Sequence, residues 1–134
     1  MTILVIDAQG GGVGKQLVTA IKQTIPHVQV TAVGTNSAAT SAMLKAGADN
    51  AATGENAVVV ACRKADVIVG PMGIVIADSL LGEITPTMAT AVGQSRAKRI
   101  LIPFNHCDTI LVGVSDFNIG KLVKNAVTEI QNLF

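Results

Sequence analysis

The stretch from Ile3 to Leu17 constrains the fold of this chain more than any other part of the sequence. It begins with the apolar run Ile3-Leu4-Val5-Ile6, which predicts a buried strand, and continues through Asp7-Ala8-Gln9 into Gly10-Gly11-Gly12-Val13-Gly14-Lys15. A strand that enters a glycine-rich turn and then a helix points backbone N–H groups at a bound anion. The stretch therefore predicts an α/β fold and a ligand that carries phosphate.

Segments typical of strands and helices alternate along the chain. Apolar runs predict strands at residues 28–33, 48–53, 66–69 and 99–102, and helical patterns cover residues 13–24, 37–46, 55–64, 74–81, 86–93 and 119–133. Alternation of this kind implies parallel strands joined by right-handed crossovers. At 134 residues the length fits one domain. The predicted fold is a single doubly wound, mostly parallel Rossmann-like α/β domain over residues 1–134.

One further strand is predicted over residues 109–114, Thr-Ile-Leu-Val-Gly-Val. Only residues 103–108 separate it from the strand at 99–102, and a parallel crossover needs a dozen residues or more. It is therefore expected to be an antiparallel edge strand, joined to its neighbour by a hairpin turn.

Composition excludes several classes of partner. The chain has 10 basic and 9 acidic residues and 14% charged residues overall, so it offers no electrostatic surface for nucleic acid or a membrane. The longest apolar run, residues 67–77, is too short to span a bilayer. Cys62 and Cys107 are too few for a disulfide framework or a zinc site, so no metal is expected and the cytoplasm is the expected location. The 49% share of hydrophobic residues fits a buried parallel sheet and a subunit interface, which makes a homodimer an expectation.

In a doubly wound sheet, ligands bind beyond the carboxyl ends of the strands. The loops at those ends are polar or rich in glycine, and they supply the predicted cofactor-binding residues. Lys15 is included because a cation in the first turn of a helix is unfavourable unless an anion lies nearby. The predicted set is Asp7, Gln9, Gly10, Gly11, Gly12, Val13, Gly14, Lys15, Thr35, Asn36, Gly70 and Pro71.

The same residues have a purely structural interpretation. Glycines before a helix let the helix pack closely on its strand, and Asp7 at the strand end can accept backbone N–H bonds. Asn36 or Ser37 is a suitable N-cap for the following helix.

The spacing of the glycines shows which of the known phosphate-binding motifs the turn can match. The pattern G-x-G-x-x-G fails at Lys15, and G-x-x-x-x-G-K-[ST] fails at Gln9 and Gln16. Gly12 and Gly14 match the spacing T-G-x-x-x-G-x-G of short-chain dehydrogenases, although that family's catalytic Tyr-x-x-x-Lys is excluded because the chain has no tyrosine. An NAD site also requires an acid after the second strand, where Gly34-Thr35-Asn36 has none. If NAD(P) or another nucleotide binds, Thr35 and Asn36 must therefore hold its ribose.

Four segments carry a closer resemblance: residues 7–15, 34–40, 41–49 and 65–71. They resemble a bacterial family of small Rossmann-like proteins, domain of unknown function 3842, over nearly the whole chain. In that family the residue after the first aspartate is usually glycine, so Ala8 departs from the pattern. The resemblance implies a nucleotide-type fold and no particular reaction.

The leading hypothesis is a domain that binds a nucleotide or dinucleotide through residues 7–15. The first alternative is an enzyme that acts on a phosphorylated small molecule with His106 or Cys107, in the cluster Asn105-His106-Cys107-Asp108. The same four residues also suit a plain hairpin turn. The second alternative is a non-catalytic interaction module that uses residues 74–88 as a subunit face.

Overall fold

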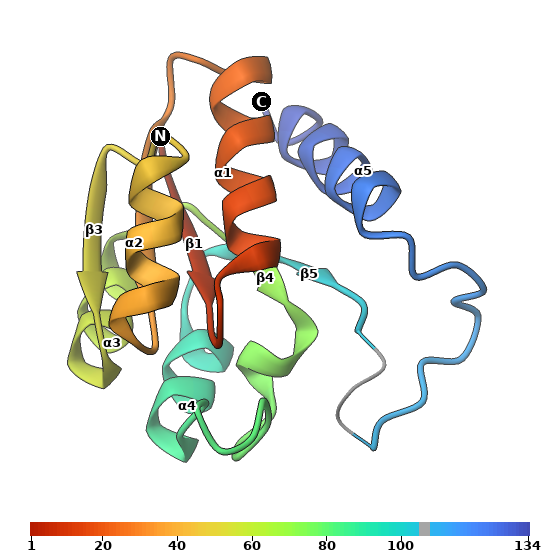
Figure 1. Cartoon of the computed structure of the whole chain (residues 1–134). Helices are drawn as coiled ribbons and strands as arrows, with labels where there is room; N and C mark the ends of the chain where they lie inside the picture. The colour runs from red at the N-terminus through yellow and green to blue at the C-terminus, as the bar shows by residue number, and fades with distance from the viewer. Residues whose placement is uncertain (105–107) are drawn as a thin grey trace.

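Parallel strands alternate with helices along the chain, as the sequence predicts (Figure 1). The computed structural model describes residues 1–104 and 108–134. The strands are β1 (Thr2–Asp7), β2 (Gln29–Gly34), β3 (Asn50–Thr53), β4 (Val67–Pro71) and β5 (Lys98–Ile102). The helices are α1 (Gly12–Thr24), α2 (Ser37–Lys45), α3 (Glu55–Lys64), the 3-10 helix η1 (Met72–Val75), α4 (Pro86–Gln94) and α5 (Ile119–Gln131). The predicted class, a doubly wound Rossmann-like α/β sheet, is confirmed.

The order of the strands in the sheet is β3-β2-β1-β4-β5, and every pairing is parallel. The chain leaves β1 toward β2 on one side, whereas β4 lies on the other side of β1 and leads to β5. The direction of winding therefore reverses between β1 and β4. A crevice forms at such a reversal, beyond the carboxyl ends of the strands, and it is where ligands bind in this class of fold.

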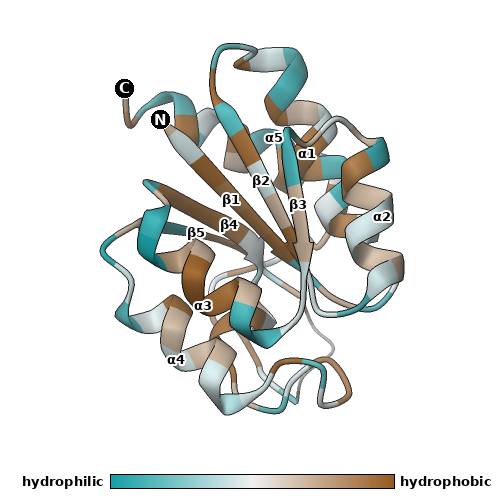
Figure 2. Ribbon diagram, turned by 90° about the vertical axis from the view of Figure 1, so that its left-hand side faces the viewer, coloured by the Kyte–Doolittle hydropathy of each residue, from teal (hydrophilic) through white to brown (hydrophobic). Residues whose placement is uncertain are grey.

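Side chains of β1 alternate between two hydrophobic cores, one on each face of the sheet. Ile3 and Val5 belong to the core under α1, α2 and α5, while Leu4 and Ile6 belong to the core under α3 and α4. Figure 2 shows the sheet between these two helical layers. Successive strand residues point to opposite faces, so a strand covered on both sides is apolar throughout. This explains the unbroken apolar run in the sequence.

Side-chain caps define where three helices begin. The Oδ1 atom of Asn36 accepts the N–H of Ala39 at 2.9 Å, which starts α2. The hydroxyl of Thr85 accepts the N–H of Met88 at 3.1 Å, and Pro86 occupies the first turn of α4. Asn118 caps α5 in the same way. Capping residues satisfy N–H groups that have no partner within the helix.

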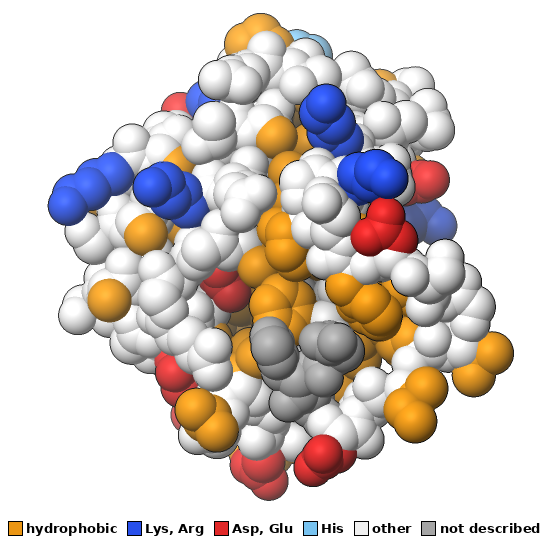
Figure 3. Space-filling view, turned by 45° about the vertical axis from the view of Figure 1, so that its right-hand side comes forward, with side chains coloured by type: hydrophobic (Ala, Val, Ile, Leu, Met, Phe, Trp, Pro, Cys, Tyr) orange, Lys and Arg blue, Asp and Glu red, His pale blue; other side chains and the backbone are white. Residues whose placement is uncertain are grey.

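The antiparallel edge strand predicted over residues 109–114 is wrong. This segment contains no strand, and residues 108–118 extend outward as an irregular loop before α5 (Figure 1). Ile110 and Val112 are 89% and 97% exposed, and Figure 3 shows single hydrophobic side chains standing at the margin of the molecule. The β-branched composition that predicted a strand is not sufficient, because a strand also needs a partner edge and a buried face.

The helix predicted over residues 74–81 is also incorrect beyond its first turn. After η1 the chain makes a series of turns in which Asp78, Leu80 and Leu81 have φ values of 65°, 55° and 58°. Left-handed residues cannot continue a right-handed helix. The hydroxyl of Ser79 donates to the carbonyl of Gly73 at 2.5 Å and anchors these turns on η1. In the described part of the chain, no helix is long and apolar enough to cross a bilayer.

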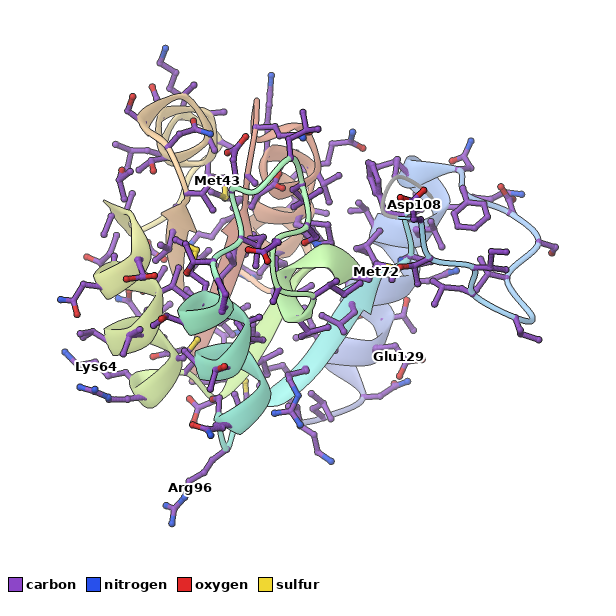
Figure 4. All side chains as sticks on the ribbon, turned by 90° about the horizontal axis from the view of Figure 1, so that it is seen from below. Met43, Lys64, Met72, Arg96, Asp108 and Glu129 are labelled. Atoms are coloured by element: carbon purple, nitrogen blue, oxygen red, sulfur yellow. The ribbon has the colours of Figure 1, made fainter. Side chains whose placement is uncertain are left out.

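Close packing of α1 on β1 requires a glycine inside the helix. A Cβ atom at Gly14 would lie 2.9 Å from the Cβ of Asp7 and 2.5 Å from the sulfur of Met43. Figure 4 shows Met43 in the region between the first two helices. We expect Gly14→Ala to destabilise the protein by about 1–3 kcal/mol, because overpacking outweighs the higher helix propensity of alanine. Urea unfolding measures this change.

Gly93 in α4 provides the matched control. Nothing lies within 4 Å of a Cβ atom placed there. Gly93→Ala should therefore stabilise the protein, by about 0.5–1 kcal/mol. Equal effects of the two substitutions would contradict the close approach of α1 to β1.

Candidate functional site

The turn between β1 and α1 lies at the carboxyl edge of the sheet, beside the crevice between β1 and β4. Gly11 is the N-cap of α1 and has a φ of 74°, and as a glycine it provides no side-chain cap. A Cβ atom on Gly11 would also lie 2.9 Å from the backbone of Ala39. Glycine is needed at this position both for the backbone conformation and for the contact with α2.

The carboxylate of Asp7 holds this turn in place. Its Oδ1 accepts the N–H of Ala8 at 2.8 Å, and its Oδ2 accepts the N–H of Gly14 at 2.7 Å. Asp7 is only 5% exposed, and this burial raises the pKa of its carboxyl group above the ordinary 3.8, against the opposite effect of the backbone N–H groups. The structural interpretation of Asp7 is therefore observed directly. Asp7 also occupies the inner part of the N-terminus of α1, so an external anion has access only to the outer N–H groups.

Gly10 and Gly12 differ from the other glycines of the turn. A Cβ atom at either position would meet nothing within 4 Å, and both residues are exposed. Neither has a positive φ. Within the described residues, no hydrogen bond uses the backbone N–H of Gly10 or of Gly12. The fold itself does not require glycine at these two positions.

The remaining predicted glycine at this edge has a packing role. A Cβ atom on Gly70 of β4 would collide with the carbonyl oxygen of Ile6 in β1. Pro71 ends β4 and lines the wall of the crevice next to the glycine turn. Gly70 therefore allows the close approach of the two central strands, and its predicted contact with a cofactor stays a prediction.

Glu83, which precedes α4, reaches across to the loop that follows β2. Its Oε1 accepts the hydroxyl of Thr35 at 2.6 Å and the side-chain amide of Asn36 at 2.7 Å. The same oxygen accepts the backbone N–H of Gln9 at 2.9 Å. These hydrogen bonds lower the pKa of the Glu83 carboxyl group, with that of Thr35 the largest cause. Sequence reasoning missed Glu83, which reads as an ordinary surface residue between Gly82 and Ile84.

A small cavity of about 140 Å³ lies between the glycine turn and the end of β4. Residues 7–13 form one side, and Pro71, Leu80 and Phe104 close the other. Two larger hollows of about 610 and 510 Å³ lie on either side of α3. These hollows are lined by side chains of α3, α4 and the strands β1 to β3, away from the glycine turn. The cavity at the carboxyl edge is the one that combines backbone donors with the reversal point of the sheet.

The other predicted site residues lie in different situations. Lys15 is exposed in the first turn of α1, and the ion pairs formed among the described residues involve Lys22 and Lys121 instead. Lys64 at the end of α3 and Arg96, which follows α4, were not predicted site residues, and both point outward (Figure 4). Among the described residues, no group of three or more His, Cys, Asp or Glu side chains is placed to hold a metal ion. His106 and Cys107 lie outside the described residues.

Comparisons with known proteins identify one matching family model and one similar solved structure. The family model described as "Domain of unknown function (DUF3842)" matches residues 2–134. No curated protein matched the chain. A solved structure described as a dodecameric FMN-dependent Ubix-like decarboxylase from Escherichia coli O157:H7 is similar, with a TM-score of 0.47 and 18% sequence identity. The match covers 98% of this chain and 76% of that chain.

The buried carboxylate of Asp7 gives a testable dependence of stability on pH. An acid whose pKa is higher in the folded protein than in the unfolded chain binds protons more readily when folded. The free energy of unfolding then falls as pH rises from the unfolded value of 3.8 through the higher folded value. We expect the wild type to lose stability relative to Asp7→Asn across this interval, measured by urea unfolding at a series of pH values.

Asp49 provides a control of opposite sign. Its carboxylate accepts the N–H of Val30 at 2.8 Å and pairs with Lys22 at 2.9 Å, and these contacts lower its pKa below 3.8. Its contribution to stability is complete above pH 3.8 and is lost as pH falls through the lower folded pKa. Asp49→Asn should therefore reduce stability at neutral pH and have less effect in acid. The same pH trend in both variants would contradict the burial of Asp7.

Proposed function

The chain belongs to the family described as domain of unknown function DUF3842, and we propose that it binds a nucleotide through the glycine turn of residues 7–15. The phosphate would bind the outer backbone N–H groups of Gly10 and Gly12, at the N-terminus of α1. In this arrangement Asp7 shapes the turn and does not contact the phosphate. Gln9, Gly11, Val13 and Gly14 complete the backbone of the site.

The observation that carries this proposal is the contrast between the glycines of the turn. Gly11 and Gly14 are explained by packing, since a Cβ atom on either would lie within 3 Å of a neighbouring atom. Gly10 and Gly12 face open space and keep free N–H groups within the described residues. Glycine without an internal packing reason is expected where a ligand must approach the backbone closely.

Electrostatics supports an anion at the same place. The N-terminus of a helix carries a partial positive charge that favours phosphate. Lys15 lies in this first turn, where its charge opposes the helix dipole unless an anion compensates. Its side chain is exposed. We therefore assign Lys15 to phosphate contact.

The dimensions of the crevice suit the phosphate end of a nucleotide. A cavity of about 140 Å³ holds a phosphate group, whereas complete small-molecule sites measure roughly 300–1,000 Å³. The nucleoside would therefore extend from the cavity along the carboxyl edge of the sheet, toward Thr35 and Asn36 or toward Pro71. NAD(P), a flavin nucleotide and a simple ribonucleotide are the ligand classes to compare.

The other functional predictions made from the sequence stay predictions. The catalytic alternative depends on His106 and Cys107, which are not among the described residues. The proposed subunit face over residues 74–88 buries Ile74, Ile84 and Met88 inside the molecule, although Leu81 is 95% exposed. A homodimer and a cytoplasmic location stay predictions.

Thermal shift with a panel of nucleotides tests the proposal. NAD, NADP, FMN, S-adenosylmethionine, ATP and GTP form the panel. A ligand at a hundredfold excess over its Kd stabilises the folded state by about 2.7 kcal/mol, which raises the melting temperature by several degrees. We expect at least one member to give this shift. No shift with any member would overturn the proposal.

Substitution of Gly12 distinguishes binding at the turn from binding elsewhere. Gly12→Val adds a side chain whose Cβ has no protein atom within 4 Å and which would obstruct the approach to the backbone N–H groups. We expect this variant to fold and to lose the ligand-induced shift. Gly120→Val, at the start of α5, is the matched control, since its Cβ makes only an ordinary contact at 3.4 Å with Asn118. An unchanged shift in Gly12→Val would place the ligand elsewhere.

A further inference from the structure

The loop after β2 lacks the acidic residue that binds ribose in dinucleotide sites, but a carboxylate occupies that position in space. Thr35 and Asn36 follow β2 directly, and both donate hydrogen bonds to Oε1 of Glu83. We propose that Glu83 is the ribose acceptor of this site, and that the ligand is a ribonucleotide with a free 2′-hydroxyl. This inference rests on the proposed function.

The position of Glu83 is set by two separate segments of the carboxyl edge, the glycine turn and the loop after β2. Asp7 of β1 pairs in register with Gly34 of β2, and the N–H of Thr35 bonds to the carbonyl of Asp7 at 3.1 Å. The end of β2 is thereby fixed beside the glycine turn. Glu83 bonds to both at once, through Gln9 on the turn and through Thr35 and Asn36 on the β2 side. A nucleoside whose phosphate lies on Gly10 and Gly12 would place its sugar at this junction.

The carboxylate keeps the capacity to bind two hydroxyl groups. An ionised carboxylate has about four acceptor sites on its two oxygens. The hydrogen bonds described for Glu83 all end on Oε1. Its Oε2 therefore keeps its acceptor sites for hydroxyl donors of a ligand, while the hydrogen bonds to Oε1 fix the orientation of the carboxylate. The hydrogen bonds that lower its pKa also keep Glu83 charged at neutral pH, which makes it a strong acceptor.

The backbone that carries Glu83 is held in a costly conformation. Four residues that precede it have positive φ values: Asp78, Leu80, Leu81 and Gly82, the last at 85°. Non-glycine residues in this conformation are strained, and such residues cluster at ligand-binding segments. Ile84 next to Glu83 is fully buried, so the turn cannot drift away from the sheet. The strained turn thus holds the Glu83 side chain in a fixed position beside the glycine turn.

The negative charge of Glu83 also disfavours ligands that carry a phosphate on the 2′ position. A 2′-phosphate placed beside the Glu83 carboxylate would meet like charge, with the second carboxylate of Asp7 close enough for Glu83 to raise its pKa. Like charges in close contact disfavour binding. The site should therefore prefer ribonucleotides with an unmodified 2′-hydroxyl over 2′-phosphorylated ones.

The test combines a change in the protein with a change in the ligand. ADP, GDP and UDP are titrated against the wild type, each beside its 2′-deoxy counterpart. For the diphosphates that bind, we expect the 2′-deoxy form to bind about tenfold more weakly, because a hydrogen bond to a charged group is lost. In Glu83→Gln the ribonucleotide should lose about tenfold, and the 2′-deoxy form should change by less than about twofold.

Glu55→Gln is the matched control, because Glu55 lies at the same edge and its carboxylate bonds to Thr85 rather than to the glycine turn. It should leave both affinities unchanged. The comparison of ribo and deoxy ligands on the wild type needs no variant, so poor folding of Glu83→Gln would not weaken the test.

Several results would overturn the inference. Equal affinity for ribo and 2′-deoxy ligands would exclude Glu83 as the acceptor, and tighter binding to Glu83→Gln would mean that Glu83 blocks the site. Binding of FMN without binding of any ribonucleoside diphosphate would overturn the inference and leave the proposed function standing. Absence of binding across the entire panel would overturn both.

Discussion

The burial of the Asp7 carboxylate is the constraint on which the carboxyl edge depends. Removing a carboxylate from water is unfavourable unless hydrogen bonds replace those of the solvent. The N–H groups of Ala8 and Gly14 supply such bonds, and the N-terminus of α1 favours the negative charge. The turn must therefore follow one path from β1 into α1. That path leaves Gly10 and Gly12 on the outside, facing the crevice.

Different surroundings shift the pKa values of two carboxyl groups at this edge, Asp7 and Glu83, in opposite directions. Burial raises the pKa of Asp7, whereas hydrogen bonds from Thr35, Gln9 and Asn36 lower that of Glu83. Each carboxylate accepts hydrogen bonds from the glycine turn, one from inside the fold and one from its rim. Together they fix the turn between β1 and α1 from both sides, so the crevice has a defined shape before any ligand binds.

The edges of the sheet explain why the chain needs no sixth strand. β3 at one edge has four residues, and β5 at the other begins with the exposed, charged Lys98 and Arg99. Short or charged edge strands discourage further pairing. Residues 109–114 therefore have no favourable edge to join, and α5 returns to pack beside α1 instead. The C-terminal helix instead contributes Val123, Ala126, Val127 and Ile130 to the core beside α1.

The sequence by itself determined the local structure and the class of fold. The apolar run of β1, the caps at Asn36 and Thr85, and the periodic stripe of α5 each act over a few neighbouring residues, so their signals are complete within the sequence. The alternation of strands and helices then leaves few topologies, and the doubly wound sheet follows.

Only the tertiary structure decided which residues meet at the site. Glu83 is separated from Thr35 and Asn36 by more than forty residues of chain, and no local pattern marks it as a partner of the glycine turn. The same holds for the glycines, because distances to Ala39, Met43 and Ile6 separate those required by packing from those that face open space. Likewise, residues 109–114 had the composition of a strand, but pairing depends on an edge supplied by other parts of the chain. Local preference is encoded residue by residue, whereas contacts between distant segments exist only once the sheet has formed.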